Sequence, residues 1–311
     1  MKKIMLTILA AFMTASMLMA QTSAPKLPLR VYVEDLPQPF PTSAKVQMEG
    51  KINQMLTANG YASFKTYSDF FITVIANPVS KEILPGAPTQ IMQALEFTFY
   101  ICDLNRQMIF STYTTSAKGV GETEAKSYLD AMKRVRINSP EVATFLDNGR
   151  KKIIEYYNAE AKNIFSKARS LALQHQYDEA FFQLCTFPTE SSAYQESINV
   201  GNEIYMSYIN YQAVQNLQKA KAVWAAEQNS QGAYLAGEYL SQILPEADCY
   251  DEAEVLFKEI KGKVLADWEW EMKKYQDGVD LKKQYIDAWT AIGVAHGNNQ
   301  QPVSTYIGWL R

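Results

Sequence analysis

The two histidines are the first side chains to weigh for acid–base chemistry. His175 stands shortly before Asp178 and Glu179, in a stretch that is expected to turn between two helices. A histidine beside a carboxylate is a common general base, but no motif marks a serine or cysteine nucleophile. His296 precedes Gly297 at an expected helix end, where the helix dipole favours a histidine. We therefore predict structural roles for both histidines and no catalytic residue.

The segment Gly119-Val120-Gly121 could bind phosphate, because a glycine-rich turn that opens a helix exposes backbone N–H groups. It lacks the Gly-Lys-Ser/Thr ending of a phosphate-binding loop and the third glycine of a dinucleotide fingerprint. A tight turn from a strand into a helix is the preferred interpretation. No cofactor is predicted.

Residues 267–271 read Asp-Trp-Glu-Trp-Glu and combine carboxylates with tryptophans, as glycan-processing sites do. Within a helix, neighbouring positions point in different directions, so a solvated acidic face explains the pattern better. A periplasmic glycan binder or glycosidase stays open as an alternative. Because the chain has two histidines and three cysteines, few soft-metal ligands are available and no metal is predicted.

Tyrosine is abundant, at 19 residues, and several tyrosines are spaced by three in an expected helix. Two interpretations stay open for them. They could pack between helices, or they could form a surface for a protein or peptide, since tyrosine is enriched at interfaces. The predicted protein-binding residues are Tyr205, Tyr208, Tyr211, Trp268 and Trp270.

The composition of the chain is that of an average globular protein. It has 311 residues, of which 47% are hydrophobic and 20% charged, which predicts about two domains with real cores. Thirty basic residues stand against 33 acidic ones. This balance argues against a nucleic-acid partner, which would require a basic surplus.

Residues 1–20 have the layout of a secretory signal peptide. Lys2 and Lys3 precede an apolar stretch, and small residues lead to cleavage before Gln21 or, as a second site, before Pro25. An uncleaved anchor is the alternative, but the stretch is shorter than the roughly 20 residues that a span requires. Without a cysteine near the cleavage region, no lipid anchor is expected. We predict a soluble periplasmic or secreted protein with no membrane span after cleavage.

The cysteines do not form a disulfide framework, although export implies an oxidising compartment. Cys102, Cys185 and Cys249 are odd in number and widely spaced. Buried thiols are therefore favoured over a single bridge, which stays open.

Residues 26–137 are expected to form an α/β sandwich module with an antiparallel or mixed sheet and two helices. The predicted elements are a strand at 29–34, a helix from Thr42 or Ser43 to Asn59-Gly60, strand structure at 64–75, a loop from Pro78 to Pro88, a hairpin of 95–101 and 107–115, and a helix from about 122.

Residues 138–300 have helical spacing almost throughout, which predicts an all-α module of five to seven helices. Residues 180–204 align without gaps on residues 236–260, with seven identical pairs. Each copy is predicted to be a short helix, a proline-containing turn and a longer helix, units that must stack on neighbours. Residues 301–311 end the chain with alternating apolar residues, and we predict a docked tail that pairs with the first module's sheet.

Residues 95–135 contain a strand, an aspartate turn, a return strand, Gly-x-Gly and a helix with spaced alanines. Together with residues 29–60, this order resembles the curli-secretion (CsgG-type) superfamily, which includes the TolB N-terminal domain and the lipoprotein activators of penicillin-binding proteins. The resemblance covers about residues 29–137 and implies a periplasmic α/β module for protein contacts. The lipidated cysteine of the secretion pore is missing. Residues 168–184 resemble a tetratricopeptide repeat.

These observations predict an α+β protein of the bacterial cell envelope that is not an enzyme. It is expected to act as a protein-interaction or scaffold module, with an envelope protein or peptide as partner. An oligomeric accessory of a secretion or pore system is the main alternative, and the oligomeric state is left open.

Overall fold

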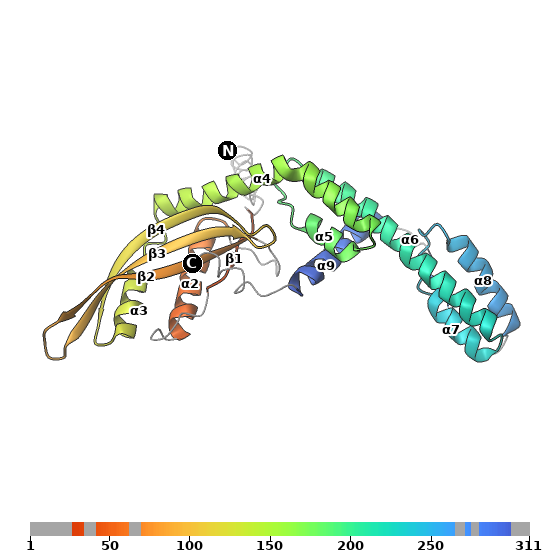
Figure 1. Cartoon of the computed structure of the whole chain (residues 1–311), viewed down its shortest axis with the longest axis horizontal. Coiled ribbons are helices and arrows are strands. Elements are labelled where there is room, and N and C mark those ends of the chain that lie inside the picture. The colour runs from red at the N-terminus through yellow and green to blue at the C-terminus, as the bar shows by residue number, and fades with distance from the viewer. Residues whose placement is uncertain (1–26, 34–41, 62–69, 265–270, 275–279, 300–311) are drawn as a thin grey trace, which may run out of the picture. The chain divides into compact units, whose positions relative to one another are not determined.

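The computed structural model of the chain describes residues 27–33, 42–61, 70–264, 271–274 and 280–299. Two compact units are present: the first runs to Ile153 and the second begins at Ile154. The first unit holds the sheet and the second is helical, which confirms the predicted α+β class (Figure 1). The division falls inside a long helix, α4 (Pro140–Leu173), whereas the two modules were predicted to meet at residues 137 and 138.

The sheet is mixed, with the strand order β1-β2-β3-β4. β1 pairs with β2 in parallel, and the other neighbours are antiparallel. The strand predicted at residues 29–34 is a short one among the described residues. The predicted hairpin is present: its first strand extends beyond 95–101 at both ends, and its second strand begins one residue later than predicted and continues to Gly121. The strands are β1 (Arg30–Val31), β2 (Phe70–Leu84), β3 (Gln90–Asp103) and β4 (Met108–Gly121).

One face of the sheet forms the core of the first unit. Leu95, Phe97 and Phe99 alternate along β3 with more exposed residues, and each is at most 1% exposed. Phe97 meets Tyr128 of α3 (Glu124–Arg134) edge to face, at 6.3 Å between ring centroids. Ile101, on the same face, contacts Gly149 of α4. Helices thus cover this face of the sheet.

Lys51 ties α2 (Thr42–Ala58) to the end of α3. Its Nζ donates hydrogen bonds to the carbonyl oxygens of Met132, Lys133 and Val135 at 2.8, 2.7 and 2.6 Å. The last carbonyls of a helix lack partners within the helix and carry a partial negative charge, so an ammonium group is favourable there. Burial lowers the pKa of Lys51 from its ordinary value.

The predicted loop from Pro78 to Pro88 is wrong in its first half. β2 continues through Pro78 to Leu84, and only residues 85–89 connect it to β3. A proline has no N–H for the strand ladder. The pairing of β2 with β3 accommodates Pro78 by a register shift between Pro78 and Ser80.

The helical half contains six helices among the described residues, within the predicted range. The interruptions near Phe187-Pro188, Asn229 and Leu244-Pro245 separate them as expected. They are α4, α5 (Tyr177–Cys185), α6 (Tyr194–Ala226), α7 (Ser230–Leu240), α8 (Tyr250–Lys263) and α9 (Leu281–Asn298).

The internal repeat corresponds to two equivalent sets of elements. α5, a turn and α6 form the first set, and α7, a turn and α8 form the second. The aligned residues Tyr194 and Tyr250 each begin the longer helix. Ala180 and Ala236 are both fully buried. The predicted unit of short helix, turn and longer helix is confirmed.

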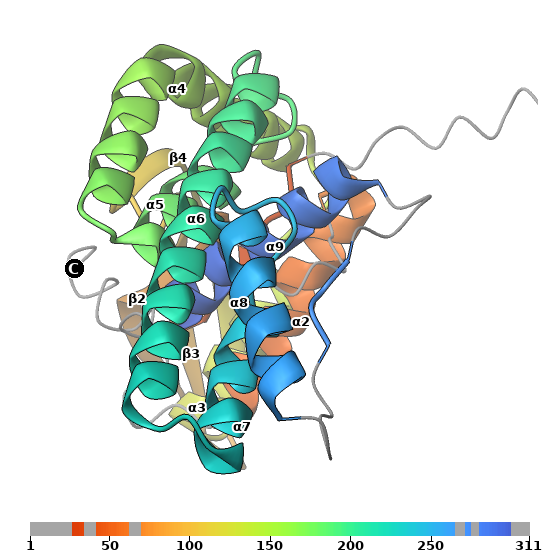
Figure 2. The ribbon, with the colours of Figure 1, turned by 90° about the vertical axis from the view of Figure 1, so that its right-hand side faces the viewer.

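α9 packs against α5 and α6 (Figure 2), and Trp289 fixes it there. Trp289 is 1% exposed, stacks on Phe181 at 6.1 Å and donates from Nε1 to Oδ1 of Asn202 at 3.0 Å. Gly201 provides the space, because a Cβ atom there would lie 2.5 Å from the indole ring. In the second set, Phe257 stands at the position aligned with Gly201.

All three cysteines lie in the described part of the chain, each as a thiol, but only Cys102 is buried as expected, whereas Cys185 and Cys249 are half-buried. Burial raises the pKa of Cys102 to about 12, so this thiol is unreactive at neutral pH. The predicted signal peptide (1–20), Trp268, Trp270 and the predicted docked tail (301–311) lie outside the described residues.

Candidate protein-binding surface

α6 brings three of the predicted binding residues together. Tyr205, Tyr208 and Tyr211 follow at intervals of three, which places them along one side of the helix. All three are half-buried. The rings of Tyr205 and Tyr208 stack with their centroids 6.0 Å apart.

α5 supplies the buried base under these rings. Tyr208 meets Tyr177 at 5.3 Å and Phe181 at 6.2 Å, both edge to face. Tyr177 also lies 5.8 Å from Tyr211, and Phe181 lies 6.2 Å from Tyr205. Tyr177 and Phe181 are buried, whereas the α6 tyrosines keep part of their surface in solvent. The α6 tyrosines therefore pack on α5, as the first interpretation expects, and keep part of their surface exposed.

His175 extends this group beyond the helices. It follows α4 with a φ of 61°, a left-handed conformation that usually requires glycine. The N–H groups of His175 and Gln176 donate back to the carbonyls of Ala172 and Leu171, both at 2.9 Å, which is the hydrogen-bond pattern of a Schellman C-cap. A residue with a Cβ costs about 1–2 kcal/mol in this conformation.

The imidazole of His175 is exposed and lies flat on Tyr211, with 4.2 Å between centroids and 22° between planes. Its Nδ1 is 3.3 Å from the hydroxyl of Tyr177. The ring contacts of this histidine are thus aromatic. Asp178 and Glu179, its predicted acidic neighbours, lie in the first turn of α5, where acids suit the helix dipole. We call His175, Tyr177, Tyr205, Tyr208 and Tyr211 the aromatic surface.

The hydroxyl groups of the aromatic surface are set up as neutral hydrogen-bonding groups. Burial, with a smaller contribution from Tyr211, raises the pKa of Tyr177. The pKa of Tyr205 is raised by burial and then by Tyr208 and Glu246. Both phenols therefore stay protonated at neutral pH. The hydroxyl of Tyr177 already donates to the carbonyl oxygen of Ser207 at 3.4 Å, whereas the hydroxyl of Tyr205 can donate a hydrogen bond while its ring offers apolar contact.

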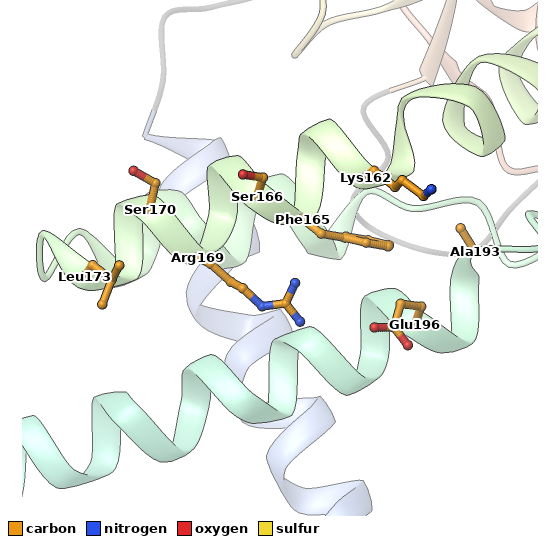
Figure 3. Close-up of a pocket in the computed structure, with 8 residues that line it drawn as sticks. All are labelled: Lys162, Phe165, Ser166, Arg169, Ser170, Leu173, Ala193 and Glu196. Carbon is orange, nitrogen blue, oxygen red and sulfur yellow. The ribbon is translucent and has the colours of Figure 1, made fainter.

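A groove lies between the second half of α4 and the start of α6, with a volume of about 730 Å³. Figure 3 shows Arg169 extending from α4 toward α6, on which Glu196 lies. Arg169 makes a two-pronged ion pair with Glu203, at 2.9 to 3.2 Å, and this pair raises the pKa of Arg169. Leu173 lines the end of the groove and is 84% exposed. Sequence patterns missed this groove because the residues that form it come from separate helices.

The glycines at residues 119 and 121 serve packing. β4 ends at Gly121, and a Cβ atom on Gly119 would lie 2.0 Å from the carbonyl oxygen of Ser127 and 2.2 Å from the nitrogen of Ala131. The predicted tight turn at these residues is wrong, because Gly119, Val120 and Gly121 are still paired with β3 and the turn into α3 falls at residues 122 and 123. The reason for the glycines is the close approach of α3, and among the described residues Gly60 is the glycine with a positive φ.

His296 lies in the last turn of α9, where the helix dipole was expected to favour it, and its ring is 5.6 Å from that of Phe182. Among the described residues, no group of three or more His, Cys, Asp or Glu side chains could hold a metal ion. No helix within the described ranges has the length and apolar character to cross a bilayer.

The chain was compared with protein families, curated proteins and solved structures. No family model matches the chain, and no curated protein matches it. Among solved structures, the chain is similar to a minor lipoprotein from Acinetobacter baumannii, with 19% identity over 40% of this chain and 91% of that chain. The TM-score is 0.24, a level of likeness from which we derive nothing about fold or function.

Replacing His175 with glycine tests whether its ring or its backbone matters. We expect His175→Gly to leave the free energy of unfolding unchanged or to raise it by up to about 1 kcal/mol, because the relief of the left-handed strain offsets the lost ring contacts. Urea denaturation measures this change. A loss of more than about 1 kcal/mol would mean that the imidazole is chiefly a structural contact.

Proposed function

We propose that the chain is an exported protein of the bacterial cell envelope that acts without catalysis, as a protein-interaction module. Its partner is an envelope protein or peptide, and the aromatic surface on α5 and α6 is where that partner binds.

The observation that carries the proposal is His175. Glycine adopts the left-handed conformation without strain, yet the chain has a histidine there, and its exposed imidazole lies flat against Tyr211. Strain of this kind is found preferentially at functional sites. Rigid aromatic side chains with one exposed edge are also the residues that contribute most to protein interfaces.

The cellular compartment in this proposal rests on the sequence. Residues 1–20 have the layout of a signal peptide. The resemblance of residues 29–137 to the curli-secretion superfamily supports an envelope module used for protein contacts. Fractionation of the native host should recover the mature chain, beginning at Gln21 or Pro25, in the periplasmic or extracellular fraction. Full-length chain beginning at Met1 in membranes would contradict this part of the proposal.

The binding part of the proposal is tested with the double variant Tyr208→Ala, Tyr211→Ala. Native and variant chains are immobilised, exposed to the same envelope fraction and compared by quantitative mass spectrometry. A partner should be depleted at least tenfold on the variant, because truncation of a central interface tyrosine typically weakens binding by about 2 kcal/mol or more. Titration calorimetry with that partner then measures each single variant.

Tyr234→Ala is the matched control. Tyr234 is also a tyrosine on a helix of the second unit, on α7, and is 51% exposed. Its removal should leave partner binding unchanged. If the control and the double variant lose the same proteins, or if neither loses any, binding does not occur at the aromatic surface.

A further inference from the structure

β4 is the last strand of the sheet, and in the described part of the chain no strand pairs with its outer side. Val120 shows which backbone groups face outward, because its N–H donates to Oδ2 of Asp130 at 2.9 Å. Backbone groups alternate between the two sides of a strand, so every second residue before Val120 directs its N–H and C=O to the same edge. These residues are Thr112, Thr114, Ser116 and Lys118, all of them exposed.

The open stretch of this edge is bounded at both ends. At the start, a register shift opposite Ile101 and Cys102 disturbs the ladder around residue 110. At the other end, Asp130 occupies the N–H of Val120, a hydrogen bond that is the main cause of the lowered pKa of Asp130. Residues 112–118 between these limits contain no proline and no glycine, and Lys118 is their one charged side chain. An edge of this kind is a template for another strand.

On the covered face of the sheet, the side chains of the open stretch are only partly buried. Tyr113, Thr115 and Ala117 alternate with the exposed residues and are half-buried. Tyr113 already stacks on Phe99, at 6.0 Å, and lies 5.8 Å from Phe145. A strand added beside β4 would cover what remains exposed of all three.

We propose that two copies of the chain join through residues 112–118 of β4, paired antiparallel about a two-fold axis at Thr115. This register uses every open N–H and C=O of the stretch on both copies, because Thr115 is its midpoint.

The side chains that meet across the axis are complementary. Tyr113 faces Ala117, a large residue beside a small one, and Thr114 faces Ser116. Within the sheet, Thr114 already makes such a hydroxyl contact with Thr98, at 3.1 Å. Lys118 faces a threonine, so no like charges are directly opposed. A strand segment that matches itself in this way favours a second copy over an unrelated strand as its occupant.

Light scattering of the purified full chain over a concentration series measures the dimer directly. Thr114→Pro removes an outward N–H that β3 does not use, so the sheet keeps its own ladder while pairing between copies is lost. Thr114→Ala changes the same side chain and keeps the N–H. We expect a dimer for the native chain and for Thr114→Ala, and a monomer with an unchanged circular dichroism spectrum for Thr114→Pro.

Two variants at position 112 test the register of the pairing between copies. Because Thr112 is exposed, neither variant should change the stability of the single chain. Thr112→Lys places a lysine opposite Lys118 of the other copy at two symmetric positions, and it should raise the dissociation constant of the dimer about fivefold. Thr112→Glu should lower that constant by a similar factor. High salt should reduce both effects.

Four results would overturn the inference or the position of its axis. The native chain could stay a monomer at every concentration, or a dimer could persist in Thr114→Pro. Deletion of residues 301–311 could also turn a monomer into a dimer, which would mean that the predicted C-terminal strand of the same chain holds this edge. Equal effects of the two charged variants would reject the axis at Thr115. None of these outcomes bears on the aromatic surface, which belongs to the second unit.

Discussion

Trp289→Ala should lower the free energy of unfolding of the second unit by about 4 kcal/mol, within the range measured for large-to-small changes at buried aromatic sites. The indole is 1% exposed, stacks on Phe181 and hydrogen-bonds Asn202, so its loss leaves both a cavity and an unpaired amide oxygen. Gly201 enlarges that cavity, because it contributes no side chain to fill the space. Urea denaturation followed by far-ultraviolet circular dichroism measures the change.

Val255→Ala is the control for this prediction. Val255 lies on α8 of the same unit and is 67% exposed, so its truncation should change the free energy of unfolding by less than about 0.5 kcal/mol. Trp289→Phe should give an intermediate loss, since an aromatic ring remains on Phe181 while the hydrogen bond to Asn202 is removed. If Trp289→Ala were as stable as Val255→Ala, α9 would not be packed on α5 and α6 as described.

Gly119→Ala should destabilise the first unit by about 3 kcal/mol, the upper part of the usual range for overpacking. The added methyl group would meet the backbone of α3 at Ser127 and Ala131, at 2.0 and 2.2 Å. Backbone atoms cannot rotate away as a flexible side chain can, so the whole helix must shift from the sheet. Hydrogen exchange of peptides from β4 and α3 should become faster, while peptides from α6 keep their protection.

Gly50→Ala separates steric conflict from a general effect of replacing glycine. Gly50 lies within α2, and a Cβ atom there would have no neighbour within 4 Å. Alanine should therefore raise the free energy of unfolding by about 0.5–1 kcal/mol through its better helix propensity. A loss of stability in both variants would contradict the close approach of α3 as the special property of position 119.

Local patterns in the sequence determined much of the secondary structure. The alternation of Leu95, Phe97 and Phe99 identified the central strand of the sheet, and the aligned pair Tyr194 and Tyr250 identified the two helical sets. These features depend on residues a few positions apart, and strand and helix periods follow directly from backbone geometry. The loop predicted from Pro78 failed because an adjacent strand accommodated the proline through a register shift, which no local pattern records.

Tertiary structure alone decided which of these residues meet. Trp289 finds Asn202 across 87 positions of sequence, and Lys51 reaches carbonyls of α3 that lie more than 80 positions away. The spacing of Tyr205, Tyr208 and Tyr211 is visible in the sequence. The sequence does not show that the backbone of His175 is left-handed or that its imidazole lies on one of those rings. Such contacts arise when helices from separate segments pack at close range. Which side chains meet in such contacts depends on how the whole unit packs, and a pattern of neighbouring residues in the sequence does not specify that packing.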